Sequence, residues 1–298
     1  MDGESETLPG PPPRVVYHRF ARVNGVRLHY VEAGAGPTVV LLHGFPEFWY
    51  SWRKQLPALA AAGFRVLAPD LRGYNLSDKP AGVHAYRMEM LTADVAGLIA
   101  HAGGGPAAVV GHDWGGAIAW MMPLRHPDAV SRLAILNAPH PAAFARALRT
   151  WEQLSRSWYM FLFQLPWLPE EMLRTRDYRF LDDALLRDAR PGAFSPEDVR
   201  LYKRALRRPG ALTAGLNYYR AAFRGMARRA RQADRTIAHR VLTVWGDRDR
   251  YLGPALTEGV GRWAPNLTTH HLPDASHWVQ NDAPDEVNRL LIDFLSRG

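Results

Sequence analysis

Short apolar runs alternate with amphipathic segments along most of this chain. The runs TVVLL (38–42) and AAVV (107–110), for example, each lie upstream of a segment whose apolar positions recur at helical spacing. Continuous apolar runs of this length are typical of strands buried on both faces, which occur in parallel sheets connected by helices. The pattern therefore predicts an α/β fold, with a mostly parallel sheet covered by helices on both faces.

The first part of the chain follows a different pattern. Residues 14–34 form two β-rich runs around Asn24 and Gly25, and both of these residues tolerate the positive φ of a tight hairpin turn. The first two strands are therefore expected to be antiparallel. With them the sequence predicts eight strands, the other six lying in 38–44, 64–73, 107–113, 130–139, 240–249 and 267–278. Helices are predicted at 51–63, 89–105, 115–127 and 284–296.

The alternation stops after the sixth strand. From Pro139 to Ile237 the chain has several helical segments and aromatic clusters but no convincing strand, and the strand pattern then resumes. A helical insertion of this kind is best interpreted as a lid over the carboxyl end of the sheet. The predicted organisation is a flexible tail (1–13), a core formed by 14–138 with 238–298, and a helical lid (139–237).

Composition narrows the class of protein. Hydrophobic residues make up 47% and charged residues 22% of the 298 residues, as in a globular protein, and there is no cysteine for a disulfide, a thiolate metal site or a thiol nucleophile. No apolar run is long enough to span a membrane, and the acidic, proline-rich start does not resemble a signal peptide. A cytoplasmic location is the resulting expectation.

The charge balance adds little about partners. Lysine and arginine total 37 against 29 acidic residues, which gives a net charge of +8. Such an excess could attract nucleic acid or anionic ligands, but the arginines cluster only around Arg228, Arg229, Arg231 and Arg235, and no nucleic-acid-binding motif accompanies them. We therefore expect no nucleic-acid partner. Whether the chain forms a homodimer stays open.

The stretch GHDWG (111–115) joins a predicted strand to a predicted helix. A nucleophile flanked by small residues at such a junction forms a nucleophile elbow, a strained turn that raises one side chain above the sheet. Here the raised residue is Asp113. Because this pattern also occurs by chance in surface turns, the assignment depends on its partners.

Partners of the right type follow in the order nucleophile, acid, histidine. Asp249 lies after the strand at 240–249, and His277 follows the last strand. Asp247 is the rival acid, although it is better placed to turn the chain. The loop after the strand at 38–44 is expected to supply one oxyanion-hole N–H from Phe45, and Trp114 the other, while His43 braces that loop.

Four stretches together resemble a known family. HGFPEFWYSWR, DLRGYNLSDKP, GHDWGG and ASHWVQND are similar to the epoxide hydrolases of the α/β-hydrolase fold, and the likeness runs from about residue 15 to the C-terminus. Two further stretches, WYMFLFQLPWLPE and LNYYRAAFR, look like the family's segments with two ring-opening tyrosines, which map onto Tyr159 and Tyr219. Tyr218 is then expected to be a packing residue. Asn75 departs from the family pattern, which usually has glycine there.

The resemblance implies hydrolysis of an epoxide to a vicinal diol through an ester on Asp113. A carboxylate is already ionised at neutral pH, so it can attack carbon without a base, and His277 with Asp249 is free to activate the water that cleaves the ester. The tyrosines would activate the epoxide oxygen. Phe45, Trp114, Phe163 and Trp278 are expected to line the substrate site, and no cofactor or metal is needed.

Three alternatives remain open at this point. A haloalkane or haloacid dehalogenase shares the fold, the aspartate nucleophile and the following tryptophan, although asparagine is more usual there at the position of Phe45. A non-catalytic binding protein and a serine esterase fit less well, because the whole constellation is retained and no serine occupies the elbow.

His270 and His271 are adjacent on a predicted strand, so they face opposite sides and make a poor chelate.

Aromatic residues in the predicted lid suggest an apolar substrate pocket. They include Trp158, Phe161, Phe163 and Trp167. This part of the sequence resembles the vertebrate enzymes of the family that act on fatty-acid epoxides, and arginines of the lid could attract a carboxylate. A small apolar epoxide and water are the expected partners.

Overall fold

A nine-stranded, mostly parallel sheet forms the centre of the protein. The computed structural model describes residues 5–7 and 15–297, without the side chains of residues 7 and 226–231. The strand order is β1-β2-β3-β5-β4-β6-β7-β8-β9, and the six strands from β5 to β9 in that order are parallel. The strands are β1 (Ser5–Thr7), β2 (Val15–Val23), β3 (Val26–Ala33), β4 (Thr38–Leu42), β5 (Arg65–Pro69), β6 (Ala107–His112), β7 (Val130–Leu136), β8 (Val241–Gly246) and β9 (Leu267–Leu272).

The predicted α/β architecture is confirmed, and its strand pattern follows from burial. Every residue of β6 and of β8 is buried, which explains their continuous apolar sequences. The hairpin is also confirmed: β2 and β3 pair antiparallel, and Asn24 (φ 47°) and Gly25 (φ 76°) form the turn between them. Two positive φ values in succession are the geometry of a type I′ turn.

One strand was missed by the sequence pattern. Residues 5–7, which we expected in a flexible tail, pair antiparallel with β2 as β1 and make the ninth strand; the rest of the expected tail lies outside the described residues. Ser5 and Glu6 are exposed. An edge strand of this kind is held mainly by main-chain hydrogen bonds, so its sequence shows no apolar alternation that would predict it.

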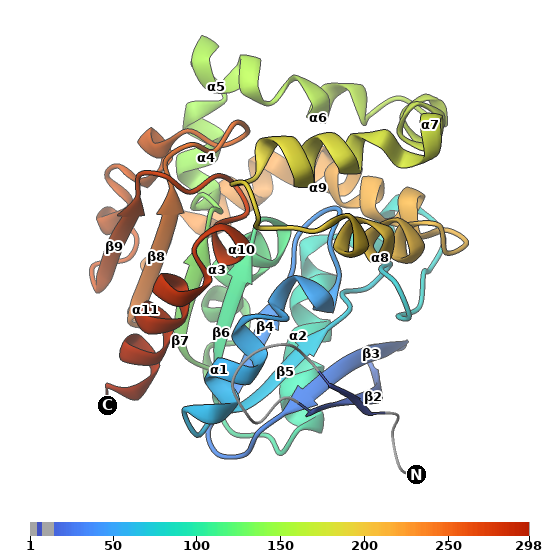
Figure 1. Ribbon diagram of the computed structural model, residues 1–298. Coiled ribbons are helices and arrows are strands. Elements are labelled where there is room, and N and C mark those ends of the chain that lie inside the picture. Colours follow the sequence, from blue (N-terminus) through green and yellow to red (C-terminus); the bar gives the residue numbers. More distant parts are fainter. Residues whose placement is uncertain (1–4, 8–14, 298) are drawn as a thin grey trace.

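Helices cover both faces of the sheet (Figure 1). In Figure 1, α1 and α11 lie on one face and α2 and α3 on the other. These helices are α1 (Gln55–Ala61), α2 (Met88–His101), α3 (Trp114–Arg125) and α11 (Pro284–Ser296), with the short α10 (Val279–Asp282). Single turns of 3-10 helix lie at Trp49–Trp52 (η1), Val83–Tyr86 (η2), Pro127–Ala129, Pro254–Thr257 and Val260–Arg262.

A second helical layer connects β7 to β8 and lies across one end of the sheet (Figure 1). It contains α4 (Pro141–Ala147), α5 (Trp151–Arg156), α6 (Trp158–Leu162), α7 (Leu168–Asp182), α8 (Pro196–Leu206) and α9 (Ala211–Ala233), with a π-helical turn at Asp183–Asp188. α7 is interrupted at residues 175–178, whose backbone is not helical. No strand interrupts these helices in the described part of the chain.

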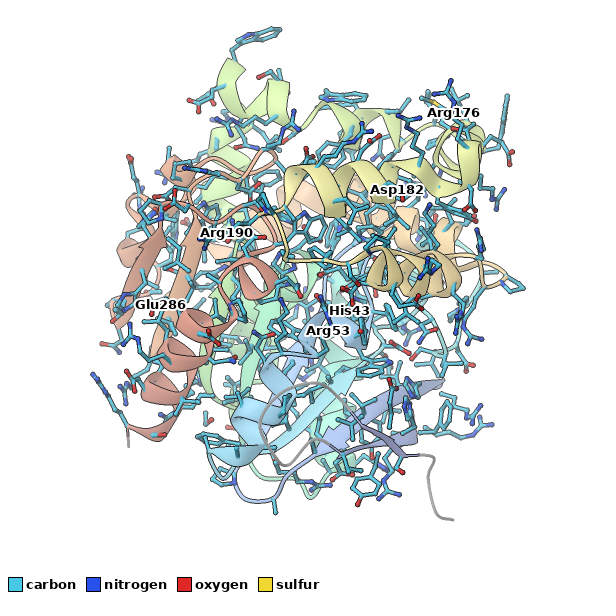
Figure 2. The ribbon with its side chains drawn as sticks, viewed as in Figure 1. His43, Arg53, Arg176, Asp182, Arg190 and Glu286 are labelled. Atoms are coloured by element: carbon cyan, nitrogen blue, oxygen red, sulfur yellow. The ribbon has the colours of Figure 1, made fainter. Side chains whose placement is uncertain are left out.

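Buried polar contacts join this layer to the core. Arg53, which follows η1, donates one hydrogen bond to the carbonyl of Ala193 (3.2 Å) and another to Oδ1 of Asn281 in α10 (2.6 Å). Figure 2 shows Arg53 and His43 beneath the layer that carries Arg176 and Asp182. The bond to Ala193 ties the helical layer to the core, and a buried guanidinium would be costly to leave unpaired. No helix among the described residues is both long and apolar enough to cross a membrane.

Candidate active site

Asp113 stands at a sharp turn between β6 and α3. Its backbone has φ 49° and ψ −116°, a conformation that side-chain-bearing residues rarely adopt. The turn is possible because glycines surround it: a Cβ on Gly111 would lie 2.3 Å from the carbonyl oxygen of Gly115, and one on Gly115 would lie 2.1 Å from that of Leu42. This is the geometry of a nucleophile elbow, with Asp113 as the raised side chain.

The Asp113 carboxylate accepts hydrogen bonds from two main-chain N–H groups. Phe45 N–H donates to its Oδ1 at 2.8 Å, and the N–H of Trp114 donates to the same carboxylate. Burial raises the pKa of Asp113, while His277 and these two N–H groups act in the opposite direction. The residues expected to form an oxyanion hole therefore point at the carboxyl group of Asp113 itself.

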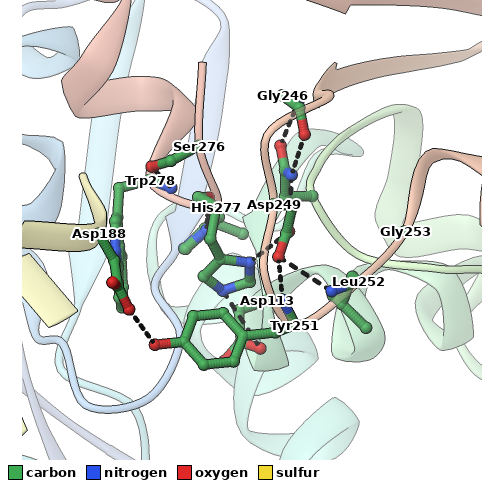
Figure 3. A network of polar contacts seen from close by, with 12 residues as sticks. Asp113, Asp188, Gly246, Asp249, Tyr251, Leu252, Gly253, Ser276, His277 and Trp278 are labelled. Atoms are coloured by element: carbon green, nitrogen blue, oxygen red, sulfur yellow. Dashed lines mark hydrogen bonds and ion pairs between the residues drawn. The ribbon is translucent and has the colours of Figure 1, made fainter. Parts of the chain in front are cut away.

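His277 lies between two carboxylates (Figure 3). Its Nδ1 is 2.6 Å from Oδ2 of Asp249, and its Nε2 is 3.8 Å from Oδ2 of Asp113. Burial lowers the pKa of His277, but Asp249, Asp113 and Glu47 outweigh this and raise it to about 9. The rival acid Asp247 instead pairs with His271 at 2.6 Å on the outer part of the molecule, so the structure brings Asp249 to the histidine.

Asp249 is held by four hydrogen bonds. Oδ1 accepts from the N–H groups of Tyr251 (2.7 Å) and Leu252 (2.9 Å), and Oδ2 accepts from Asn137 Nδ2 (2.8 Å) as well as from His277. Burial alone would raise the pKa of Asp249, but His277 and these donors lower it. The carboxylate therefore stays ionised and fixes the imidazole with its Nδ1 protonated.

Two tyrosines from the helical layer lie above Asp113. Tyr159 comes from α6 and Tyr219 from α9, and their ring centroids are 6.0 Å apart. Burial, and then the charge of Asp113, raise the pKa of both phenols well above its ordinary value, so both remain protonated donors at neutral pH. Tyr218 turns away and donates to the carbonyl of Arg72 at 2.7 Å, which fits the packing role expected for it.

Two cavities of very different size meet at the active site, and both are lined by Asp113, Tyr159 and Tyr219. The wider cavity, of about 600 Å³, includes the expected Phe45, Phe163 and Trp278 in its lining. The narrower one, of about 80 Å³, is lined by Trp114 and by apolar residues such as Phe144 and Met160. A molecule bound at Asp113 can therefore extend far in one direction and only a little in the other.

The aromatic residues of the predicted lid divide between these cavities and the outer surface. Trp158 and Phe163 line the wider cavity, whereas Phe161 packs edge-on against Phe223 at the surface and Trp167 is 70% exposed. Two of the four aromatic residues, Trp158 and Phe163, therefore line a cavity at Asp113, and Phe161 and Trp167 do not. Composition alone does not show which face of so short a helix is turned inward.

Comparison with known proteins places this geometry in a family. The family model described as the alpha/beta hydrolase fold matches residues 37–284. The chain is 40% identical to Epoxide hydrolase 3 of Xenopus tropicalis, over 93% of this chain and 77% of that protein. It superposes on the crystal structure of the Bacillus megaterium epoxide hydrolase in complex with an inhibitor with a TM-score of 0.86, at 33% identity, covering 94% of this chain and all of the other. The chain belongs to the epoxide hydrolases of the α/β-hydrolase fold.

A further relative carries a broader description. The AB hydrolase superfamily protein YfhM of Bacillus subtilis is 43% identical, over 93% of this chain and 97% of that protein. The matches to the broader superfamily and to the named epoxide hydrolases both agree with the family resemblance of the four sequence stretches. In this epoxide hydrolase the family's usual glycine is replaced by Asn75, which adopts φ 38° and donates through Nδ2 to Asp70 (2.9 Å), so the turn is retained.

Several supporting residues of this epoxide hydrolase were missed by the sequence. His112, next to the nucleophile, has Nδ1 at 2.7 Å from Oε2 of Glu47 and Nε2 at 2.8 Å from the carbonyl of His277. Both ring nitrogens of His112 therefore lie within hydrogen-bonding distance of an oxygen atom. His112 and Glu47 both lie inside quoted stretches, but nothing in the sequence shows that they pair or that the pair supports the main chain of His277.

His43 lies near the active site and has a structural role. His43 is buried; its Nδ1 donates to the carbonyl of Gly44 (2.8 Å) and its Nε2 accepts from the N–H of Leu71 (3.0 Å), so it braces the loop as expected (Figure 2). Burial lowers the pKa of His43, which keeps it neutral. Among the residues that the structure describes, no three His, Asp or Glu side chains gather as a metal site would require.

Proposed function

We propose that this protein hydrolyses epoxides to vicinal diols through a covalent ester on Asp113. The observation that carries the proposal is a carboxylate held at a nucleophile elbow by two main-chain N–H groups, with two protonated tyrosines above it and His277 beside it. The family to which the chain belongs supports the reaction class.

In the first step, the free oxygen of Asp113 attacks one epoxide carbon, and the C–O bond of the ring breaks. Oδ1 is held by Phe45, which leaves Oδ2 as the attacking atom. The departing oxygen is a poor leaving group as an alkoxide, so a proton donor must meet it, and Tyr159 and Tyr219 serve as the donors. General acid assistance of this kind is commonly worth about 100-fold or more in rate.

In the second step, His277 removes a proton from water, and the water oxygen attacks the ester carbonyl of Asp113. The first step itself prepares the histidine for this role. Asp113 loses its negative charge on forming the ester, and this charge is one of the interactions that raise the pKa of His277. The pKa of His277 therefore falls in the ester, and the imidazole becomes able to accept a proton.

Charge that develops on the carbonyl oxygen in this step meets the N–H groups of Phe45 and Trp114. They already bind the carboxylate, so no rearrangement is needed as the oxyanion forms, and one such donor is typically worth about 3 kcal/mol. Asp249 stabilises the positive form of His277 until the proton is returned to the departing diol. Hydrolysis leaves Asp113 as the free acid, and its proton returns to the tyrosinate formed in the first step. The enzyme is thereby restored without a cofactor.

Residues 139–237 act in this proposal as a lid domain on the core formed by 14–138 and 238–298. They supply both tyrosines and one side of each cavity, so they complete the site as well as cover it. Apolar lining residues keep bulk water away from the tyrosines, and this strengthens their hydrogen bonds to the epoxide oxygen. The wider cavity accepts an apolar substituent of considerable length, such as the chain of a fatty-acid epoxide.

A dehalogenase is the second candidate, because the indole Nε1 of Trp114 is buried without a hydrogen-bond partner among the described residues and could bind a halide. The side chain of Phe45, however, supplies no second donor. Incubation of the purified protein with styrene oxide and with 1-bromobutane separates the two functions. We expect diol from the epoxide and no halide release; release of bromide without diol formation would establish the dehalogenase instead.

A further inference from the structure

A third cavity lies away from Asp113, where the helical layer meets the core. It has a volume of about 350 Å³ and shares no lining residue with the two cavities at the active site. Its lining comes from η2 and the start of α2, from the end of α3, and from the middle and the end of α9. Three segments that are distant in sequence therefore converge on one hollow.

Positive charge dominates this hollow. Arg87, Arg125 and Arg224 line it, and Glu89 is the one carboxylate in its lining. Glu89 is already engaged, since its Oε1 accepts from Arg125 Nη2 at 2.8 Å. Within the described part of the chain, neither Arg87 nor Arg224 has a carboxylate partner.

Arg125 is already held at one nitrogen: its Nη2 donates to Gln232 Oε1 as well as to Glu89. Its Nε is buried and has no hydrogen-bond partner among the described residues. The same cation acts on its neighbour: burial, and then Arg125, lower the pKa of His126.

Glu89 offsets the charge of Arg125, and the guanidinium groups of Arg87 and Arg224 repel each other unless a further anion lies between them. The planar fork of arginine matches the oxygens of a phosphate group in a two-bond geometry, which a halide ion cannot provide. The volume falls in the usual range for small-molecule sites, about 300–1,000 Å³, and is larger than a bare phosphate ion requires. Val83, Met88 and Ala221 provide an apolar wall for the remainder of a ligand.

We propose that this cavity is a binding site for a phosphate monoester, with the phosphate held by Arg87, Arg125 and Arg224. Arg224 belongs to α9 and the other two arginines to the core, so a bound phosphate joins the helical layer to the core. Tyr219 lies five residues before Arg224 on the same helix. The ligand therefore stabilises the helix that carries one of the two tyrosines above Asp113.

The test is a calorimetric titration of the purified protein with phenyl phosphate, a phosphate monoester, in the absence of epoxide and at ionic strength matched with sodium chloride. We expect saturable binding with a Kd of about 1 mM or tighter. Arg87→Gln and Arg224→Gln should each weaken binding at least about tenfold, because each removes a two-bond contact to the phosphate. Arg149→Gln, at an exposed arginine outside the cavity, is the matched control and should bind as the unchanged protein does.

Epoxide hydrolysis without added phosphate should be the same in all three variants, which shows that each is folded. Sedimentation with phosphatidylcholine vesicles containing phosphatidic acid then identifies the source of the phosphate. Retention of the unchanged protein but not of Arg224→Gln assigns a lipid headgroup, and no retention assigns a soluble monoester. The proposal is overturned if phenyl phosphate does not bind, or if Arg87→Gln and Arg224→Gln bind it as tightly as Arg149→Gln.

Discussion

Replacing Asp249 with asparagine should separate the two steps of the reaction. The substitution keeps the size of the side chain but removes the charge that contributes most to raising the pKa of His277 from 6.5 to about 9. A shift of this size corresponds to about 3 kcal/mol of stabilisation of the imidazolium, at 1.36 kcal/mol for each pKa unit. Loss of most of it should slow the water-activating step at least about 100-fold.

The first step should be nearly unaffected, because Asp113 needs no base to attack. The ester should therefore accumulate in Asp249→Asn, and intact-protein mass spectrometry after mixing with styrene oxide should show the mass of the protein plus one epoxide. The small rate of hydrolysis that remains should reach its midpoint at a lower pH than in the unchanged protein. The direction follows from the lost charge, since it favoured protonated His277.

Asp247→Asn is the matched control for this experiment. It makes the same chemical change two residues away, at a carboxylate that pairs with His271 rather than with His277. It should turn over normally and accumulate no ester. Normal diol production by Asp249→Asn, or ester accumulation in Asp247→Asn at a similar level, would refute the assignment of Asp249.

Three other predictions concern the tyrosines, the support of the loop and the shape of the substrate. Tyr159→Phe and Tyr219→Phe should each slow ester formation by about 10- to 100-fold without slowing ester hydrolysis. Single-turnover tryptophan fluorescence measures both steps. An equally slow rate of ester formation in Tyr218→Phe would count against this role of the two tyrosines. Glu47 has a pKa of about 2, because His112 and its other hydrogen-bond partners outweigh the opposing effect of burial. Its ionised form therefore contributes about 3 kcal/mol of stability above its ordinary pKa of 4.5, which is lost as the pH falls through 2. In urea unfolding, Glu47→Gln should accordingly be less stable by about this amount at pH 7 and lose less stability on acidification; parallel curves for the two proteins would exclude the mechanism. The narrow cavity of about 80 Å³ is too small for a phenyl ring, because a cavity of about 150 Å³ holds benzene. trans-Stilbene oxide should therefore be hydrolysed far more slowly than styrene oxide, and Phe144→Ala should reduce the difference in kcat/KM; equal kcat/KM values for the two epoxides in the unchanged protein would be evidence against two unequal cavities.

The features that the sequence predicts well are those that depend on local backbone geometry. The turn at Asp113 requires glycine at 111 and 115, because a Cβ at either position would collide with main-chain atoms. The hairpin turn at Asn24 and Gly25 is predictable for a similar reason, since both residues have positive φ. Local steric requirements of this kind leave a direct trace in the sequence.

Contacts between distant segments leave no such trace. The pair formed by His112 and Glu47 joins residues 65 positions apart, and the bond from Asn137 to Asp249 joins residues 112 positions apart. The aromatic residues of the lid show the same limit, because Phe163 and Trp167 differ in burial through tertiary packing that their shared apolar character does not specify. The cavity at Arg87, Arg125 and Arg224 likewise exists only after three segments have folded together.

The proposed ester is tested most directly by following the oxygen of water into the protein. Excess enzyme is allowed one turnover of styrene oxide in heavy-oxygen water, and the peptide containing Asp113 and the diol are then analysed by mass spectrometry. If water attacks the ester carbonyl, the label should enter the side chain of Asp113, and the diol should carry the aspartate's original oxygen without label. Label in the diol with none in Asp113 would show that water attacks the epoxide directly, and it would contradict the covalent mechanism.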